Sequence, residues 1–158
     1  MEPLPACPHC DETLRPWRWC LRICRRSHGE TDYLWIRILF CDTCQRSHRQ
    51  LPDCLVPHKH YDAVSIEAGL QDGTTAAVAA DESTIYRWHH WFRAWSVYAV
   101  GVFVALQQRG AATESVEPSR SLPPILRLLG RWVGDASGWL ARAVLPMVRG
   151  HYWQCFPG

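Results

Sequence analysis

The sequence lacks a large excess of charge of either sign, because 17 Lys and Arg residues are balanced by 15 Asp and Glu residues, a net charge of +2 in 158 positions. Such a balance does not by itself indicate a strongly anionic partner. The acidic residues are few and fall at expected turns and helix caps. A nuclease or transposase core needs converging carboxylates that hold magnesium. We therefore expect a protein that is not an enzyme.

The N-terminus lacks the basic region and apolar run of a secretory signal. The longest apolar run, at 94–106, is interrupted by Ser96, Tyr98 and Gly101. It falls short of the roughly 20 residues that span a bilayer. We therefore expect a cytoplasmic protein with no membrane partner. In that compartment the eight cysteines are expected to bind metal rather than to form disulfides.

Two Cys-x-x-Cys pairs are the strongest motif of the chain, Cys7 with Cys10 and Cys41 with Cys44. Each pair can form a knuckle, a tight turn that directs two thiolates at one ion. Two knuckles give the four-sulfur tetrahedral site that Zn²⁺ prefers, and such a closed site leaves no open position for a catalytic water. The alternative is four buried thiols without a metal, but two separate pairs favour zinc.

The 30 residues between the two pairs predict a long hairpin or a small sheet. Residues 17–25 and 33–40 have strand character, and a turn is expected at 27–30. In the second segment, side chains alternate between two faces. One face holds Leu34, Ile36, Ile38 and Phe40, and the other holds Tyr33, Trp35, Arg37 and Leu39. Because so small a domain has little core, the metal is expected to supply much of its folding energy.

Other cysteines and histidines in this region are weaker candidates for metal binding. Cys20 and Cys24 are interpreted as packing residues of a strand, with a second metal site that includes His28 as the alternative. His9 and His48 lie beside the knuckles. Either can replace a cysteine ligand, but a position next to the metal site is favoured for both.

The densest basic run precedes the expected turn and consists of Arg15, Arg18, Arg22, Arg25 and Arg26. Interleaved with Trp17 and Trp19, these arginines are candidate contacts to a nucleic-acid phosphate backbone. Arg37, Arg46 and Arg49 can join them. A solvated strand face explains the same residues equally well.

Residues 50–60 contain two prolines, which exclude a helix and indicate an extended connector. Leu51, Leu55 and Val56 are expected to pack on both flanking modules. Cys54 is expected to be a small core residue.

Three helices are expected next, at 61–70 with Val64 and Ala68 inward and Ile66 as a further inward candidate, at 75–80, and from an N-cap at Ser83 to about residue 109. In the third helix an apolar stripe shares one buried face: Ile85, Trp88, Phe92 and Trp95. The side chains offered outward suit a DNA major groove, namely Ser83, Thr84, Tyr86, Arg87 and His90. The alternative is an ordinary amphipathic helix with a wet polar face.

The remaining sequence predicts a linker at 110–122 and two apolar helices at 125–133 and 139–148. Pro123 and Pro124 can open the first of these helices, and Gly134 and Gly138 separate it from the second. Both helices are apolar on more than one side. They are therefore expected to pack on residues 95–106 or on a partner chain, the latter giving a homo-oligomer.

A series of short motifs follows the second knuckle: Cys41-x-x-Cys44, Ser47-His48-Arg49, Leu51-Pro52-Asp53, Val56-Pro57, Lys59-His60-Tyr61, Ile66-Glu67 and Ser83-Thr84-Ile85-x-Arg87-Trp88-x-x-Trp91-Phe92. In order and spacing they resemble a bacterial family of small proteins, a domain of unknown function. Its members look like the zinc-ribbon and helix-turn-helix front end of transposases. The resemblance covers roughly residues 4–95 and implies nucleic-acid binding by analogy.

Together these observations predict an α+β protein with a zinc ribbon and connector at 1–57, a helix-turn-helix-like module at 58–109, a linker at 110–122 and a helical tail at 123–158. The expected function is that of a zinc-dependent DNA-binding accessory or regulatory protein of a mobile genetic element, associated with a transposase. The alternative is a protein-interaction subunit whose Trp-rich helices dock on a partner.

Overall fold

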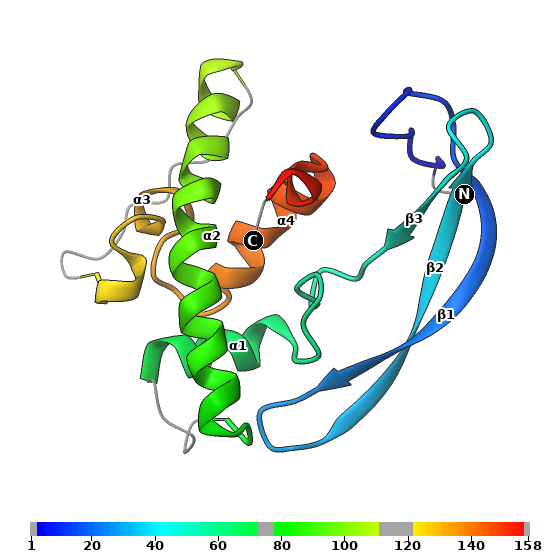
Figure 1. Cartoon of the computed structure of the whole chain (residues 1–158). Helices are drawn as coiled ribbons and strands as arrows, with labels where there is room; N and C mark the ends of the chain where they lie inside the picture. The colour runs from blue at the N-terminus through cyan, green and yellow to red at the C-terminus, as the bar shows by residue number, and fades with distance from the viewer. Residues whose placement is uncertain (1–2, 73–77, 111–121, 157–158) are drawn as a thin grey trace.

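The computed structural model describes residues 3–72, 78–110 and 122–156. It has the expected α+β architecture, a sheet of three antiparallel strands followed by helices (Figure 1). The strands are β1 (Arg15–Arg25), β2 (Thr31–Cys41) and β3 (Arg46–Gln50), in that order across the sheet. The helices are α1 (Ala63–Asp72), α2 (Glu82–Gln108), α3 (Gly130–Val133) and α4 (Trp139–Arg149), with short 3₁₀ turns η1 (Pro124–Leu126) and η2 (Tyr152–Cys155). Among the described residues, no helix combines the length and apolar character that crossing a membrane requires.

β1 and β2 form the long hairpin that the sequence predicts, and the pairing ends where Arg25 lies opposite Thr31. The turn contains Gly29, whose φ of +86° lies in the region that favours glycine. The third strand is not predicted, because β3 contains no apolar side chain that could reveal an alternating pattern. It forms because the second knuckle reverses the chain and places Arg46 opposite Cys41 on β2.

The inner face of the sheet is directed toward the helices and carries buried residues along its length. Cys24 and Ile36 are buried there against Leu55 of the connector, and Cys20 packs on the same cluster. This confirms both cysteines as packing residues. Within the described part of the chain, the four knuckle cysteines are the one group of side chains placed to share a metal ion.

The opposite, outer face is covered at its knuckle end. There Leu39 is buried in a small cluster with Leu14, Cys7 and Cys41. The predicted alternation of side chains between the two faces of β2 is therefore observed, but facing outward does not by itself mean exposure. Leu39 is nevertheless buried while Tyr33 and Trp35 of the same face are exposed.

One apolar core runs through the helical part, from Val56 in the connector to Met147 in α4. The predicted stripe of α2 is confirmed, because all four of its members are buried in this core: Ile85, Trp88, Phe92 and Trp95. The C-terminal segments pack on α2 of the same chain, the first of the two arrangements expected. Their contribution includes Leu126, Leu129, Trp132, Trp139, Leu140 and Met147. Most tryptophans of the helices are therefore used inside the protein's own core.

The start of α2 differs from the prediction, because Asp81 and not Ser83 is the N-cap residue. The Asp81 carboxylate accepts the backbone N–H of Thr84 at 2.7 Å and the Ser83 hydroxyl at 2.6 Å. Both residue types are good caps, and a carboxylate adds a favourable interaction with the helix dipole. The far end agrees with the prediction, since Arg109 is the C-cap.

Two buried positions are also predicted wrongly. Val64 is exposed, whereas Ile66, the further inward candidate, is buried together with Leu70. Cys54 is exposed as well, because the neighbouring Leu55 takes the buried position in the connector.

The C-terminal helix expected at 125–133 is broken into η1 and α3. Its apolar residues lie on several sides, and a single straight helix can bury only one of them. The helix expected at 139–148 is confirmed as α4. The helix expected at 75–80 lies partly outside the described residues, and residues 78–80 are not helical. Linker residues 111–121 also lie outside the described part.

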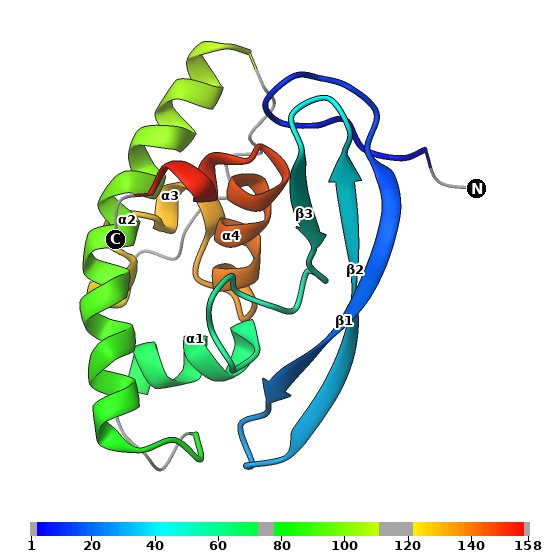
Figure 2. The ribbon, with the colours of Figure 1, turned by 45° about the vertical axis from the view of Figure 1, so that its right-hand side comes forward.

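The tip of the β1–β2 hairpin is fixed to the start of α1 (Figure 2). The Arg25 N–H donates to the His60 carbonyl at 2.7 Å, and the Asp62 N–H donates to the Arg25 carbonyl at 3.1 Å. The Arg26 guanidinium joins Asp32 of the hairpin, at 2.7 Å, to Asp62 at the start of α1, at 2.8 Å. The hairpin tip and α1 therefore meet at one end of the molecule, far from the knuckles.

The connector and a buried carboxylate complete the framework. Leu55 belongs to the cluster on the sheet and Val56 to the helical core, so the connector packs on both modules as predicted. Glu67 of α1 is buried, and its two oxygens accept the N–H groups of Gly138 at 2.8 Å and Leu140 at 2.9 Å. These groups start α4, where backbone donors have no acceptor within the helix.

Candidate metal centre and basic cleft

Each knuckle is a sharp backbone turn closed by a residue in the left-handed conformation. Asp11 follows Cys10 with φ of +57°, and Gln45 follows Cys44 with φ of +55°. In the first knuckle the Asp11 N–H donates to the Cys7 carbonyl at 2.9 Å. Non-glycine residues adopt this conformation rarely. Its occurrence directly after the second cysteine of both pairs indicates that the two knuckles share one type of turn. The turns direct both thiols of each pair to one point.

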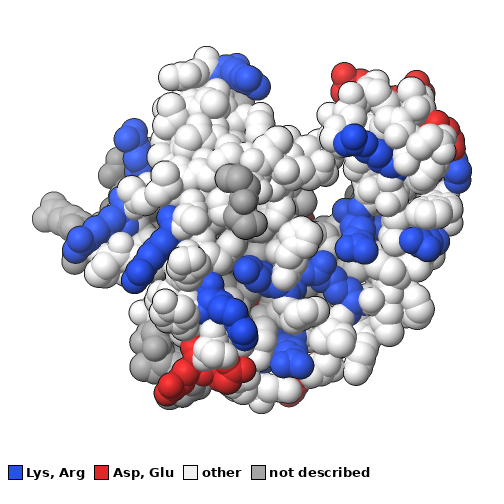
Figure 3. All heavy atoms as spheres, viewed as in Figure 1, with Lys and Arg blue, Asp and Glu red and all other residues white. Residues whose placement is uncertain are grey.

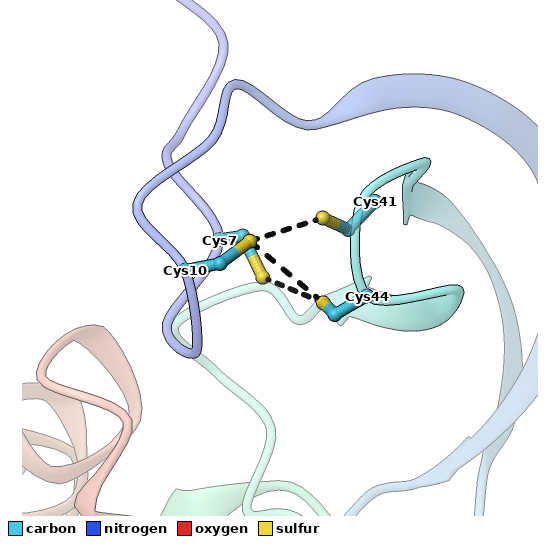
Figure 4. Close-up of side chains that lie close together, drawn as sticks. All are labelled: Cys7, Cys10, Cys41 and Cys44. Atoms are coloured by element: carbon cyan, nitrogen blue, oxygen red, sulfur yellow. Dashed lines mark hydrogen bonds between the residues drawn. The ribbon is translucent and has the colours of Figure 1, made fainter.

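The four predicted ligands converge at that point (Figure 4). The Sγ atoms of Cys7 and Cys44 lie 3.4 Å apart, as do those of Cys10 and Cys41. All four sulfurs lie within 4.8 Å of one another. Zn–S bonds of about 2.3 Å in a tetrahedron place sulfurs about 3.8 Å apart, so this donor set reaches the geometry of a Zn²⁺ site with changes of at most about 1 Å in the sulfur–sulfur distances. Bound there, the ion would crosslink the N-terminal loop to the β2–β3 turn.

The crowded thiols ionise unequally. A hydrogen bond from the Cys44 backbone N–H lowers the pKa of Cys41 to about 7, and neighbouring thiols assist. The hydrogen bond from Cys44 to the Cys41 sulfur, together with burial and the remaining thiols, raises the pKa of Cys44 to about 12. One thiolate is therefore available near neutral pH, and a metal must displace a proton from Cys44.

The two histidines predicted beside the knuckles lie next to the four sulfurs. The ring Nε2 of His48 lies 3.7 Å from Cys7 Sγ, which places a ring nitrogen beside a ligand sulfur. Burial and then the neighbouring His9 lower the pKa of His48. His9 instead contacts Arg46, with 3.1 Å between its Nε2 and the Arg46 Nη1. Four sulfurs already complete a tetrahedron, so neither ring is needed as a ligand.

The five arginines of the predicted basic run do not form one continuous surface. Arg15 donates to Asp42 at 2.7 Å, and Arg26 is held by Asp32 and Asp62. Arg22 turns to the inner face and donates to the carbonyls of Val56 and Lys59, at 3.3 and 2.8 Å. Arg18 stacks on the Trp17 ring at 4.2 Å, and Arg25 lies 5.8 Å from the Tyr61 ring. Arg18 and Arg22 remain next to one another on the inner face.

The outward residues predicted on α2 do lie together at its start. Ser83, Tyr86, Arg87 and His90 are exposed, and Thr84 is half-buried. The Arg87 guanidinium donates to the Thr84 hydroxyl at 2.9 Å, which extends the side chain along the helix surface. The polar side of the helix is therefore accessible, and the C-terminal tail packs elsewhere on α2.

A basic cleft lies between the inner face of the sheet and the C-terminal segment (Figure 3). Its volume is about 360 Å³, and its lining includes Arg18, Arg22, His48, Arg49, His58 and His151. Burial and then the neighbouring Arg49 lower the pKa of Arg22. At the edge of the same region, burial and then Arg87 lower the pKa of Lys59.

We name these four cations, Arg49, Arg22, Lys59 and Arg87, the basic row. Successive members are linked by charge repulsion or by the contact of Arg22 with the Lys59 carbonyl. No ion pair between described residues involves any of the four. The sequence alone did not single out Lys59 as a candidate site residue. It is the only lysine in the chain and lies in one of the resemblance motifs, so a signal was present.

Two knuckles that close one end of a small antiparallel sheet define the class of metal-binding ribbons. The family model described as a domain of unknown function (DUF6431) matches residues 7–88, and the chain belongs to this family. The match runs from Cys7 in the first knuckle to Trp88 in α2, so it includes both knuckles and the basic row. No curated protein and no solved structure matches the chain.

Proposed function

We propose that this protein is a zinc-dependent DNA-binding protein, in which the basic row holds phosphates and the start of α2 faces the bases. The observation that carries the proposal is the basic row itself. Four cations are gathered across the junction of sheet and helices, and no ion pair between described residues engages them, although the Asp81 carboxylate attracts Arg87.

Such a gathering is unfavourable in the isolated protein. Burial and a cationic neighbour each lower the pKa of Arg22 and of Lys59, which means that the charged forms are destabilised. A phosphate backbone would relieve both effects, because it supplies anions at regular spacing and releases condensed counterions. The balanced net charge of the chain does not oppose this, since the cations of the basic row lie near one another and many Lys and Arg side chains are seen on the face drawn in Figure 3.

The two ends of the basic row suggest different roles. Arg49 and Arg22 lie in the cleft and are suited to phosphate contacts that fix the register of the protein. At the other end Arg87 lies on the exposed side of α2 and can hold a phosphate beside the groove. Tyr86 and His90 lie next to it, where side chains can reach base edges in a major groove about 12 Å wide. Asp81 and Glu82 precede them, but Asp81 is engaged in capping the helix.

Zinc would serve this function by holding the sheet in shape. Arg49 is on β3, a strand of five residues that directly follows the second knuckle. A closed four-sulfur site offers no coordination position for a substrate, which favours a binding role over catalysis. The association with a transposase or a mobile element rests on the sequence resemblance described above.

The test is DNA binding measured by fluorescence anisotropy on a labelled duplex over a range of salt concentrations. If four phosphates are neutralised, the logarithm of the association constant should fall with the logarithm of salt with a slope of about −3.6. The Lys59→Ala and Arg87→Ala variants should each bind more weakly and reduce the slope by about 0.9.

The matched control is Arg109→Ala, which removes the same charge from the opposite end of α2. Its affinity and salt slope should equal those of the wild-type protein. The proposal fails if the zinc-loaded wild type does not bind duplex DNA at low salt. It also fails if all three variants lose affinity equally, because the charge would then act without regard to position.

A further inference from the structure

The outer face of the β1–β2 hairpin displays large aromatic side chains in solvent. Its outward residues pair across the two strands as Trp19 with Arg37, Leu21 with Trp35, and Ile23 with Tyr33. Trp19 is 60% exposed, Tyr33 61% and Trp35 66%. We name these three rings the outer aromatic face.

Neither the hairpin nor the helical part covers these rings in the described structure. The helices lie on the inner side of the sheet (Figure 1, Figure 2). The alternate residues Cys24 and Ile36 are buried on that side, so strand alternation directs the three exposed rings the other way. Single exposed hydrophobic residues are ordinary, but a contiguous exposed patch marks an interaction site. The interaction surface is thus formed by the sheet, whereas the tryptophans of the helices mostly pack in the core.

The charge of the outer aromatic face distinguishes between possible binding partners. Along Trp19 to Arg25 and Thr31 to Arg37, strand alternation places one arginine among these rings, Arg37, and no acid. Arg25, at the hairpin tip, lies instead 5.8 Å from the Tyr61 ring. A second copy docked face to face would bring like charges together, which is unfavourable. A polyanion with flat apolar groups matches both properties of the surface.

Single-stranded nucleic acid has this chemistry. Its unpaired bases can stack on tryptophan and tyrosine rings while its phosphates lie near arginine. Side chains on opposite or diagonal positions of an antiparallel pair are roughly 5–8 Å apart, a spacing that allows successive bases to reach neighbouring rings. The base faces of a duplex are already stacked on one another, so a duplex cannot use this surface.

We propose that the outer aromatic face binds single-stranded nucleic acid by base stacking, an inference that rests on the proposed nucleic-acid-binding function and extends it to a second substrate class. The basic row and the outer aromatic face lie on different sides of the sheet. One protein could therefore hold a duplex and an adjoining unpaired strand together.

The test compares a labelled oligothymidylate of about 12 nucleotides with a labelled duplex, both measured by fluorescence anisotropy with the zinc-loaded protein. The Trp19→Ala and Trp35→Ala variants should each weaken binding of the single strand about tenfold or more. Trp35→Phe keeps an aromatic ring and should retain most of the affinity. Duplex binding should be unchanged in all three, and zinc content with circular dichroism shows that each variant is folded.

The outcomes separate this inference from the proposed function. If the wild type binds duplex but not the single strand, or if the alanine variants bind the single strand as tightly as wild type, the inference is overturned and the proposed function stands. Binding to neither probe overturns both. If sedimentation shows a wild-type dimer that Trp35→Ala dissociates while single-strand binding is unaffected, the face is an interface between copies and the inference is overturned.

Discussion

Replacing Glu67 by glutamine should destabilise the protein more than its small change in shape suggests. The buried carboxylate accepts two backbone N–H groups, from Gly138 and Leu140, at the start of α4. Glutamine keeps one acceptor oxygen, but its amide NH₂ must face the other N–H, so two donors meet. The substitution Glu67→Gln therefore removes one charge-assisted hydrogen bond and leaves a donor without an acceptor.

The size of the effect follows from these contacts. A hydrogen bond to a charged group contributes roughly 1.5–3 kcal/mol, and a carboxylate near a helix N-terminus adds about 0.3–1 kcal/mol. Removing a buried charge returns part of this, because the amide is easier to desolvate than the carboxylate. We expect a loss of about 2–3 kcal/mol in the free energy of unfolding.

The assay is urea denaturation of the zinc-loaded protein, followed by tryptophan fluorescence and circular dichroism. The midpoint should fall while the slope with denaturant stays constant, because the surface exposed on unfolding is unchanged. Glu82→Gln is the matched control, since Glu82 is exposed in the first turn of α2 and its replacement should cost only about 0.3–1 kcal/mol. If Glu67→Gln is no more destabilising than this control, the capping role assigned to Glu67 is wrong.

Two further predictions concern the metal and the hairpin tip. Zinc binding should release protons and weaken as the pH falls, because Cys44, with a pKa raised to about 12, is protonated before binding. The pKa of Cys41 is about 7, so this thiol is mostly protonated at pH 6 and mostly ionised at pH 8. Calorimetry in buffers of different ionisation enthalpy should therefore find about one more proton released per zinc ion at pH 6 than at pH 8. An equal number at both pH values would contradict the thiol assignment. Arg26→Ala should leave the nearly buried Asp62 without its ion pair and lower the free energy of unfolding by about 2 kcal/mol. This value is discounted for solvent screening, because Arg26 is partly exposed. In the same urea titration Arg109→Ala should be nearly neutral.

The elements that the sequence predicts well are those whose signals are local. The knuckles follow from a spacing of three residues, and the stripe from Ile85 to Trp95 follows from helical periodicity. Both need only the geometry of a turn or of one helix. The hairpin is similar, because two strand-like segments flank a turn that contains Gly29.

The features that the sequence does not reveal depend on where distant segments pack. β3 has no apolar pattern and is recruited by the knuckle and the edge of β2. Ser83 and Asp81 are both good caps, and the carboxylate takes the contact with Thr84. Alternation separates Trp35 from Ile36 correctly, but only the position of the helices decides which of the two is exposed.

The attachment of the hairpin tip to α1 has a consequence for how any ligand can approach. Backbone hydrogen bonds and the ion pairs of Arg26 join the sheet to α1 at the hairpin tip, so these two elements cannot move apart at that end. A ligand of the cleft beside Arg49 must therefore fit against a sheet that is held to α1 at the hairpin tip. If the proposed DNA binding is correct, this attachment favours recognition of DNA by a preformed surface over closure of the sheet and α1 around it.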